Sequence, residues 1–228
     1  MLIAERNGLL GDELPYDAQV EYLESTGTQW IDTGVPFVRN TITATFTLLY
    51  SNIWQNNIIV CCRFVRTNNT SGSTGRFWYL YVAREKFHRC YYSNWNAMPN
   101  SPTINALETY TATVSSSDAG YEVICNDITM TSDKVGASSN GITMTLFADV
   151  GNKTTSSFFE TPVPMRIHNV KIFSANGGDA LERDIIAVRK NGIGEMYDKV
   201  TGTFLERHGT FIIGPDKITQ RERGGGGV

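Results

Sequence analysis

Alternation of apolar and polar residues dominates the central part of the chain. In NTITATFTLLY, Asn40–Tyr50, four threonines at positions 41, 43, 45 and 47 alternate with Ile42, Ala44, Phe46 and Leu48. Successive side chains of a strand point to opposite faces, so a period of two predicts a strand with one buried and one hydroxyl-bearing face. We expect Phe46 and Leu48 to lie in the core, and Thr43 and Thr45 to face solvent.

Other segments show the same period, and turn-forming residues separate them. ETYTATVSSSDAGYEVIC (108–125) and GEMYDKVTGTFLE (194–206) each predict a hairpin, the second with its turn between Asp198 and Gly202. RFWYLYVAREKF (76–87), GITMTLFADVG (141–151) and PMRIHNVKIFSANGG (164–178) predict further strands. Helical periodicity is nearly absent. The pattern therefore predicts an all-β, antiparallel two-sheet jelly-roll sandwich with Leu146 and Phe173 in its core.

The 228 residues suit one large β-sandwich domain. We expect residues 1–15 to form an N-terminal extension that serves as an anchoring segment, and residues 16–216 to form the sandwich. Residues 217–228, which include the run Gly224–Gly227, should form a Gly-rich tail, because fixed glycines lose much entropy and bury no side chain. The two extensions are expected to lie outside the sandwich.

Charge and hydropathy exclude several classes of partner. The net charge is −3 and no run of Lys or Arg occurs, which argues against nucleic acid as a ligand. No stretch approaches the ~20 apolar residues of a membrane span, and the start of the chain lacks a signal-peptide pattern. We therefore expect synthesis in a cytoplasm without export by the general secretory route, and no membrane insertion. The four cysteines, Cys61, Cys62, Cys90 and Cys125, are expected to be mostly buried free thiols, with one bridged pair as an alternative.

Two segments resemble a known group of proteins. VEYLESTGTQWIDTG, Val20–Gly34, and the closing segment Arg183–Asp216 are similar to concanavalin A-like lectin/glucanase (LamG-like) sandwich domains of gut-bacteriophage and gut-bacterial proteins. The closing segment departs from the group at Ala187, where Pro is usual. The resemblance implies a concanavalin A-like jelly roll. Within the opening segment, Gly27 and Gly34 should permit turns, and the large ring of Trp30 should belong to the core.

A catalytic carboxylate set is not expected. The β-glucanase members of this group carry Glu-x-Asp-x-x-Glu, whereas Glu182-x-Asp184 is followed by Ala187 at the third position. A retaining glycosidase needs two carboxylates about 5–5.5 Å apart, and Glu195 and Asp198, three residues apart on a strand, point to opposite faces. We therefore predict a non-enzymatic protein in which Glu182 and Asp184 are solvated charges.

No cofactor or metal ion is expected, with Ca²⁺ as an open alternative. Related sandwich domains often hold Ca²⁺ with loop oxygens, and FADVGN (147–152) offers Asp149 and Asn152 in a turn. Two such side chains are common in any turn, so this feature alone does not establish a site.

Aromatic and amide side chains gather in CYYSNWN (90–96), beside polar loops. Aromatic rings stack on the C–H faces of sugars, and amides bond sugar hydroxyls, so we predict a ligand-binding site formed by Tyr91, Tyr92, Asn94, Trp95 and Asn96. The competing interpretation assigns these rings to the core.

The leading hypothesis is a non-enzymatic, lectin-like virion protein of a bacteriophage: a fiber, tail or head-decorating adhesin on the particle surface. Its expected partners are bacterial surface polysaccharide, other virion proteins and further copies of itself. One alternative is a purely structural virion component that makes only protein contacts. Another is a bacterial surface glycan-binding protein or glycoside hydrolase.

Overall fold

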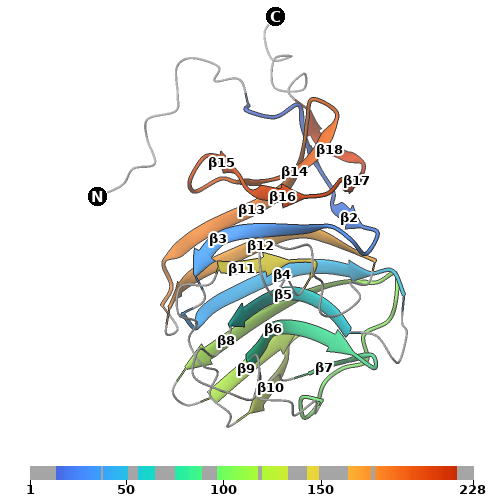
Figure 1. Ribbon diagram of the computed structural model, residues 1–228. Helices are drawn as coiled ribbons and strands as arrows, with labels where there is room; N and C mark the ends of the chain where they lie inside the picture. Colours follow the sequence, from blue (N-terminus) through green and yellow to red (C-terminus); the bar gives the residue numbers. More distant parts are fainter. Residues whose placement is uncertain are drawn as a thin grey trace, which may run out of the picture.

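The protein folds as an antiparallel β-sandwich (Figure 1). The computed structural model describes residues 14–36, 38–50, 56–64, 75–88, 97–117, 120–132, 143–148, 164–175 and 178–219. These ranges contain strands and turns but no α-helix, as the alternation in the sequence predicts. In them, no helix has the length and hydropathy needed to cross a membrane.

The larger sheet contains twelve of the described strands. Its main path runs β10-β9-β8-β4-β12-β13-β1-β18, and β2, β14, β15 and β17 pair beside this path. The bounds are β1 (Ala18–Val20), β2 (Leu23–Ser25), β4 (Asn40–Leu48), β8 (Thr109–Ser117), β9 (Gly120–Cys125), β10 (Ile128–Ser132), β12 (Met165–Ala175), β13 (Leu181–Lys190), β14 (Ile193–Asp198), β15 (Thr203–Phe204), β17 (Ile212–Ile213) and β18 (Asp216–Thr219).

The smaller sheet contains six described strands in the order β16-β3-β11-β5-β6-β7. The bounds are β3 (Trp30–Pro36), β5 (Asn56–Phe64), β6 (Gly75–Ala83), β7 (Lys86–Phe87), β11 (Thr143–Leu146) and β16 (Glu206–His208). All of its pairings are antiparallel. Because β16 and β3 come first in this order, they form one margin of the sheet, and this margin lies close to the β14–β15 hairpin of the larger sheet (Figure 1).

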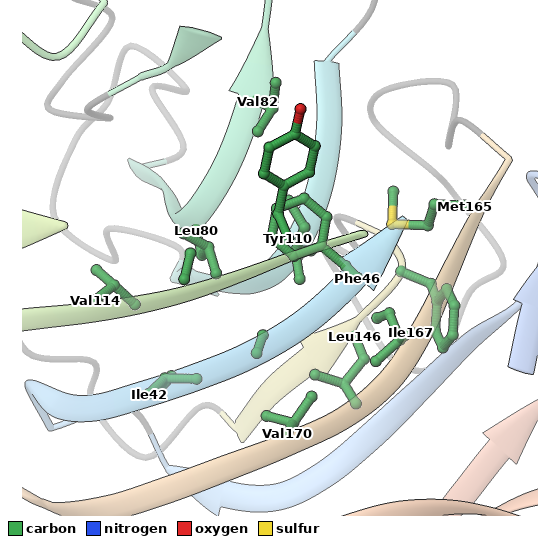
Figure 2. Close-up of a cluster of buried hydrophobic side chains, with 14 of the residues drawn as sticks. Ile42, Phe46, Leu80, Val82, Tyr110, Val114, Leu146, Met165, Ile167 and Val170 are labelled. Carbon is green, nitrogen blue, oxygen red and sulfur yellow. The ribbon is translucent and has the colours of Figure 1, made fainter. Parts of the chain in front are cut away.

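The core lies between the sheets, and Figure 2 shows side chains of β4, β6, β8, β11 and β12 meeting there. Phe46, Leu48 and Leu146 are at most 2% exposed, which confirms their predicted burial. Trp30 is buried as predicted, at 4% exposed, but it packs outside this core, against Ala148 and stacked on His208. The prediction for Phe173 is wrong, because this side chain is only partly buried. Ile172 points into the core, and strand alternation therefore turns Phe173 toward the outer face.

The threonines of β4 lie on the outer face of the larger sheet, as predicted. The hydroxyls of Thr43, Thr45 and Thr47 pair with Thr113, Thr111 and Thr109 of β8 at 2.9, 3.0 and 2.9 Å. Cross-strand hydroxyl pairs of this kind contribute to sheet stability. The period of two in the sequence therefore separates a core face from a hydrogen-bonded polar face.

Both predicted hairpins are confirmed. β8 and β9 pair up to Ser117 and Gly120. In the second hairpin, Tyr197 of β14 lies opposite Phe204 of β15, with ring centroids 5.1 Å apart. Gly27 has a φ value of 105° and lies between β2 and β3, which confirms its turn. Gly34, with a φ value of 68°, lies within β3 where the register against β11 shifts, so it serves a β-bulge and the turn expected there is wrong.

The segment 76–87 is a hairpin and not the single strand that its bulky residues suggest. β6 ends at Ala83, and β7 returns after a turn at Arg84 and Glu85, which have φ values of 50° and 59°. Two-residue hairpin turns of this type favour Asn and Gly, so the sequence gives no turn signal here. Leu80, Tyr81 and Val82 are all buried, so this part of β6 is covered on both faces.

The first and last described strands are neighbours in the larger sheet. Ala18 and Gln19 of β1 lie opposite Thr219 and Ile218 of β18. The expected boundary at Asp216 is therefore three residues too early, because Lys217–Thr219 still pair with the sheet. Leu14, in the expected N-terminal extension, packs against a cluster of Tyr16, Ile186 and Val188. The rest of the division into sandwich and extensions stays a prediction.

Candidate functional site

The predicted ligand residues Tyr91, Tyr92, Asn94, Trp95 and Asn96 lie outside the described residues. The residues that flank this segment are hydrogen-bonded to one another and to β7. His88 and Ala97 form an isolated antiparallel bridge, and Met98 N–H donates to the Phe87 carbonyl at 2.8 Å. The Ser101 hydroxyl accepts from Phe87 N–H at 2.8 Å. These contacts join the described residues on either side of the predicted segment.

A polar pocket lies at the margin of the sandwich, where β3 and β16 of the smaller sheet approach β13 and the β14–β15 hairpin. We call it the rim pocket. It is open to solvent and has a volume of about 240 Å³. It is lined by Asp32, Thr33, Gly34, Arg183, Thr201, Thr203, Phe204, Leu205 and Glu206. The lining residues thus include two acidic residues, an arginine, three threonines and a phenylalanine.

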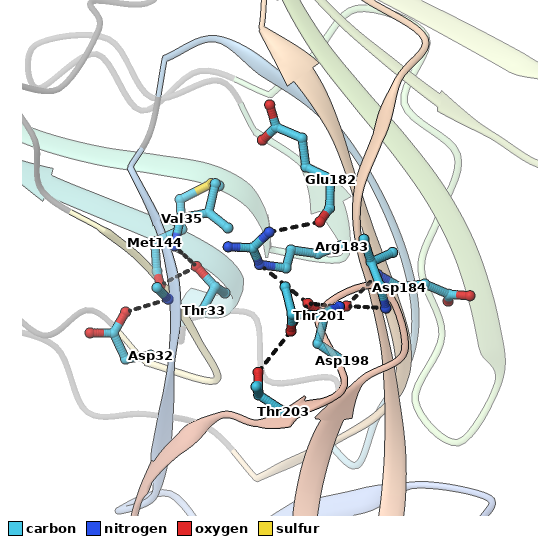
Figure 3. A network of polar contacts seen from close by, with 12 residues as sticks. Asp32, Thr33, Val35, Met144, Glu182, Arg183, Asp184, Asp198, Thr201 and Thr203 are labelled. Atoms are coloured by element: carbon cyan, nitrogen blue, oxygen red, sulfur yellow. Dashed lines mark hydrogen bonds and ion pairs between the residues drawn. The ribbon is translucent and has the colours of Figure 1, made fainter. Parts of the chain in front are cut away.

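Asp198 organises the hairpin side of the rim pocket (Figure 3). Its side chain is 0% exposed. One carboxylate oxygen, Oδ1, accepts from the backbone N–H groups of Asp184 at 2.9 Å and Val200 at 3.1 Å. The other, Oδ2, accepts from Thr201 N–H at 3.3 Å and lies 3.3 Å from Arg183 Nε. A buried carboxylate requires such partners, and this one ties β13 to the turn after β14.

Two threonine hydroxyls extend this network into the pocket. Thr201 Oγ1 donates to Asp198 Oδ2 at 2.6 Å and lies 2.7 Å from Thr203 Oγ1. A hydroxyl has one proton, and that of Thr201 is already donated to Asp198. Thr203 must therefore be the donor in the Thr203–Thr201 bond. The lone pairs of Thr203 Oγ1 remain available to accept a hydrogen bond from a ligand.

The opposite wall of the pocket comes from β3. Asp32 Oδ1 accepts from Gly34 N–H at 3.0 Å, and Thr33 Oγ1 donates to the Met144 carbonyl at 2.9 Å (Figure 3). Asp32 lies directly opposite Glu206 in the β3–β16 pairing. Side chains that are directly opposed in an antiparallel pair share one face, so both carboxylates are on the same side of the smaller sheet.

The carboxylates that the sequence raised as catalytic candidates have partners in the structure. Glu182 Oε2 accepts from Asn40 Nδ2 at 3.3 Å, and Asp184 Oδ2 lies 2.6 Å from Lys199 Nζ. Glu195 Oε1 accepts from Arg207 Nε at 2.8 Å. The expectation that Glu182 and Asp184 are simply solvated is wrong, because both are partly buried. These contacts assign the carboxylates roles in holding neighbouring strands together.

The described ranges contain no group of three or more His, Cys, Asp or Glu side chains placed to hold a metal ion. Asp149 and Asn152, the oxygen ligands considered for Ca²⁺, lie outside those ranges. Cys125 is a buried free thiol, as expected. The Ca²⁺ alternative therefore stays a hypothesis.

The rim pocket was not found from the sequence. Its residues come from three separate segments, and no spacing along the chain connects Asp32 with Arg183 or Thr203. One local signal exists: Asp198 is followed by Thr201 and Gly202, a pattern in which an Asp side chain accepts the N–H groups two and three residues later. That pattern identifies the turn but not the cavity beside it.

Comparisons with known proteins establish the fold class. No protein-family model and no curated protein matches the sequence. A candidate carbohydrate-binding protein from Bacteroides ovatus is similar in structure, with a TM-score of 0.53 and 11% identity over 88% of this chain and 61% of that chain. The SAP-like pentraxin from Limulus polyphemus, a heptamer, gives a TM-score of 0.48 and 12% identity over 91% of this chain and 99% of its own.

The chain thus spans less than two thirds of the Bacteroides ovatus protein. At this identity the similarity shows the fold alone. The protein is an all-β antiparallel sandwich of the concanavalin A-like class, as the two sequence segments implied.

Proposed function

We propose that this protein is a non-enzymatic, lectin-like virion protein of a bacteriophage that binds bacterial surface polysaccharide. It is made in the host cytoplasm and acts on the particle surface as a fiber, tail or head-decorating adhesin. It contacts other virion proteins there and forms homo-oligomers. The resemblance of Val20–Gly34 and Arg183–Asp216 to gut-phage and gut-bacterial domains supports the phage origin.

The observation that carries the glycan proposal is the rim pocket. Sugar sites combine a few directed polar groups with a ring on which the C–H face of the sugar stacks. Thr203, Asp32 and Arg183 supply the polar groups, whereas the Phe204 ring packs against Tyr197 and Lys190 on the face of β15 opposite to Thr203, so a stacking ring has to come from another segment. A volume of about 240 Å³ is below the ~300–1,000 Å³ of most drug-sized sites and suits a single sugar ring.

The segment Tyr91–Asn96 is proposed as a second contact region for the same polysaccharide. Tyr92 and Trp95 would supply stacking faces, and Asn94 and Asn96 would bond hydroxyls. A chain-like ligand can engage two separated sites on one domain and so gain affinity.

The test is a glycan array of bacterial surface polysaccharides, followed by calorimetric titration of the glycans that bind. Thr203→Val removes one pocket hydroxyl at nearly constant shape and should weaken binding about two- to tenfold, the value of one hydrogen bond. The matched control is Thr111→Val, which removes a hydroxyl from the outer face of β8 and should leave affinity unchanged. Trp95→Ala should weaken binding roughly ten- to hundredfold with the fold intact.

The structural alternative predicts a different result. If the domain makes only protein contacts, no glycan binds, and Trp95→Ala leaves phage adsorption unchanged or blocks particle assembly. Hydrolysis is tested separately: we expect no reducing sugar from β-glucans with the unmodified protein or with Glu182→Gln. Sugar release that disappears in Glu182→Gln would contradict the non-enzymatic assignment.

A further inference from the structure

Among the described residues that line the rim pocket, Arg183 carries the positive charge. An arginine in a sugar site ordinarily indicates an acidic sugar, because its planar fork matches a carboxylate. Here the guanidinium is already engaged. Arg183 Nε lies 3.3 Å from Asp198 Oδ2, and Nη1 donates to the Glu182 carbonyl at 2.7 Å. The buried carboxylate therefore balances the charge that would attract an anion.

The hydroxyls of the pocket also disfavour an acidic ligand, independently of the charge of Arg183. Because Asp198 accepts the Thr201 proton, Thr203 donates to Thr201 and presents lone pairs toward the pocket. A sugar hydroxyl can donate to these lone pairs. A carboxylate has no proton to donate, so its oxygens would face an acceptor. The fixed direction of this hydrogen-bond chain thus disfavours an acidic group next to Thr203.

The remaining charges of the pocket are negative and also disfavour an anionic ligand. Asp32 and Glu206 are directly opposed on β3 and β16 and both line the cavity. Their carboxylates lie on one face of the smaller sheet, with Asp32 on the other side of β3 from Arg183 (Figure 3), so they repel an anionic ligand at longer range, by an amount that falls with salt concentration. Glu206 is 70% exposed and its Oε1 lies 3.2 Å from His208 Nε2, so the contribution of its charge is strongly screened.

We propose that the rim pocket selects uncharged sugars over acidic ones, and that buried Asp198 is the positioning residue that sets this selectivity. The inference rests on the proposed function and specifies its ligand class. Asp198 does not touch the ligand. It acts by neutralising Arg183 and by fixing the direction of the Thr203–Thr201 hydrogen bond.

The test uses three matched pairs of methyl glycosides: galactose, glucose and mannose, each beside its uronic acid, in which C6 is a carboxylate. Weak binding of such small probes is measured by NMR titration of the full chain at neutral pH. For the sugar that fits the pocket, we expect the neutral member to bind about tenfold more tightly than its uronic acid. The shifted resonances should include Thr203 and Phe204.

The informative variant is Asp198→Asn. Its amide cannot neutralise Arg183, and its NH₂ group can donate to Thr201, which then donates to Thr203 and turns the Thr203 proton toward the pocket. We expect the affinity for the uronic acid to rise about tenfold, while the neutral sugar, which can accept as well as donate, changes less than about threefold. A purely structural role for Asp198 would instead weaken both ligands together.

Two further variants complete the test. Glu206→Gln removes the charge of an exposed side chain that contacts His208 and should raise uronic-acid affinity about twofold at low salt and by less at high salt. Asp17→Asn is the control. Asp17 N–H donates to the carbonyl of Arg189, which lies on β13 about 20 Å along the strand from Arg183, so loss of the Asp17 charge should leave both affinities unchanged. The Glu206 side chain is solvent-exposed, so we expect Glu206→Gln to fold. It therefore tests the inference even if Asp198→Asn does not fold.

The outcomes separate the two proposals. Wild-type protein that binds array glycans but prefers uronic acids, or binds sugars without shifts in the rim pocket, overturns the selectivity inference and leaves glycan binding intact. Folded Asp198→Asn with unchanged uronic-acid affinity also overturns it. An absence of binding to every glycan refutes the proposed function and this inference with it.

Discussion

Replacing Asp198 by Asn removes a formal charge from a carboxylate that solvent does not reach. The side chains have nearly the same shape, so the change tests electrostatics and hydrogen bonding with no cavity left behind. The amide must place its oxygen at one carboxylate position and its NH₂ group at the other. We expect the NH₂ group to replace Oδ2, because the two donors lost there, Thr201 N–H and Arg183 Nε, are the two longest contacts, each at 3.3 Å.

The magnitude follows from those two losses. One unsatisfied backbone N–H costs about 1 kcal/mol, and separating a partly exposed arginine from its buried carboxylate costs roughly 1–2 kcal/mol, below the ~3–5 kcal/mol of a fully buried pair. Arg183 is 27% exposed, which justifies the lower value. Asp198→Asn should therefore lower the free energy of unfolding by about 2–3 kcal/mol. A domain with a stability of ~5–15 kcal/mol remains folded after such a loss.

Urea denaturation with linear extrapolation measures this difference, provided that the m value is unchanged. Asp184→Asn is the matched control, because it removes the same charge from a carboxylate paired with the exposed Lys199. That control should cost no more than about 1 kcal/mol. Equal losses at the two positions, or a loss below about 1 kcal/mol at Asp198, would refute the argument that burial makes the Asp198 network strong.

Three further predictions concern other parts of the fold. Replacing the turn residues Arg84→Asn and Glu85→Gly, which have positive φ, should raise the free energy of unfolding by about 1 kcal/mol in the same denaturation assay, and no gain would argue against strain in this turn. Burial and then Lys217 lower the pKa of His168 from its ordinary value of 6.5, so the unfolded chain binds more protons. Stability should therefore fall as the pH drops below about 6.5, and His168→Gln should flatten this part of the profile; an unchanged profile would contradict the assignment. Burial also raises the pKa of Cys125 to about 11, so mass spectrometry after iodoacetamide treatment at pH 8 should find Cys125 modified only in unfolded protein.

The sequence predicted the sandwich because a period of two is a local property that burial enforces along each strand. Thr43 and Phe46 fall on opposite faces as expected, and the β14–β15 hairpin follows from turn residues within a few positions. The failures arise where local pattern and tertiary context differ. Phe173 is apolar but follows the inward-facing Ile172, and the turn at Arg84 and Glu85 lacks the residues that such turns favour.

The candidate sites were less predictable than the fold. Clustered aromatic and amide residues made the segment Tyr91–Asn96 visible in the sequence, and its assignment stays a prediction. The rim pocket was not visible, because Asp32 and Arg183 are brought together only by the meeting of two sheet margins. The burial of Asp198 could not be read from the sequence either, since most Asp residues in turns face solvent.

β1 and β18 are neighbours in the larger sheet, which makes the domain suited to insertion into other proteins. Strands that pair in a sheet lie about 5 Å apart, so the chain enters and leaves the sandwich at nearly the same point. Entry and exit points this close allow a domain to be inserted into a surface loop of a host protein without spreading the ends of that loop. They also permit circular permutation, in which a short linker joins β18 to β1 and new termini open at an exposed turn such as Asn126–Asp127. The sandwich therefore has the geometry of a domain that can be inserted into a host protein or circularly permuted.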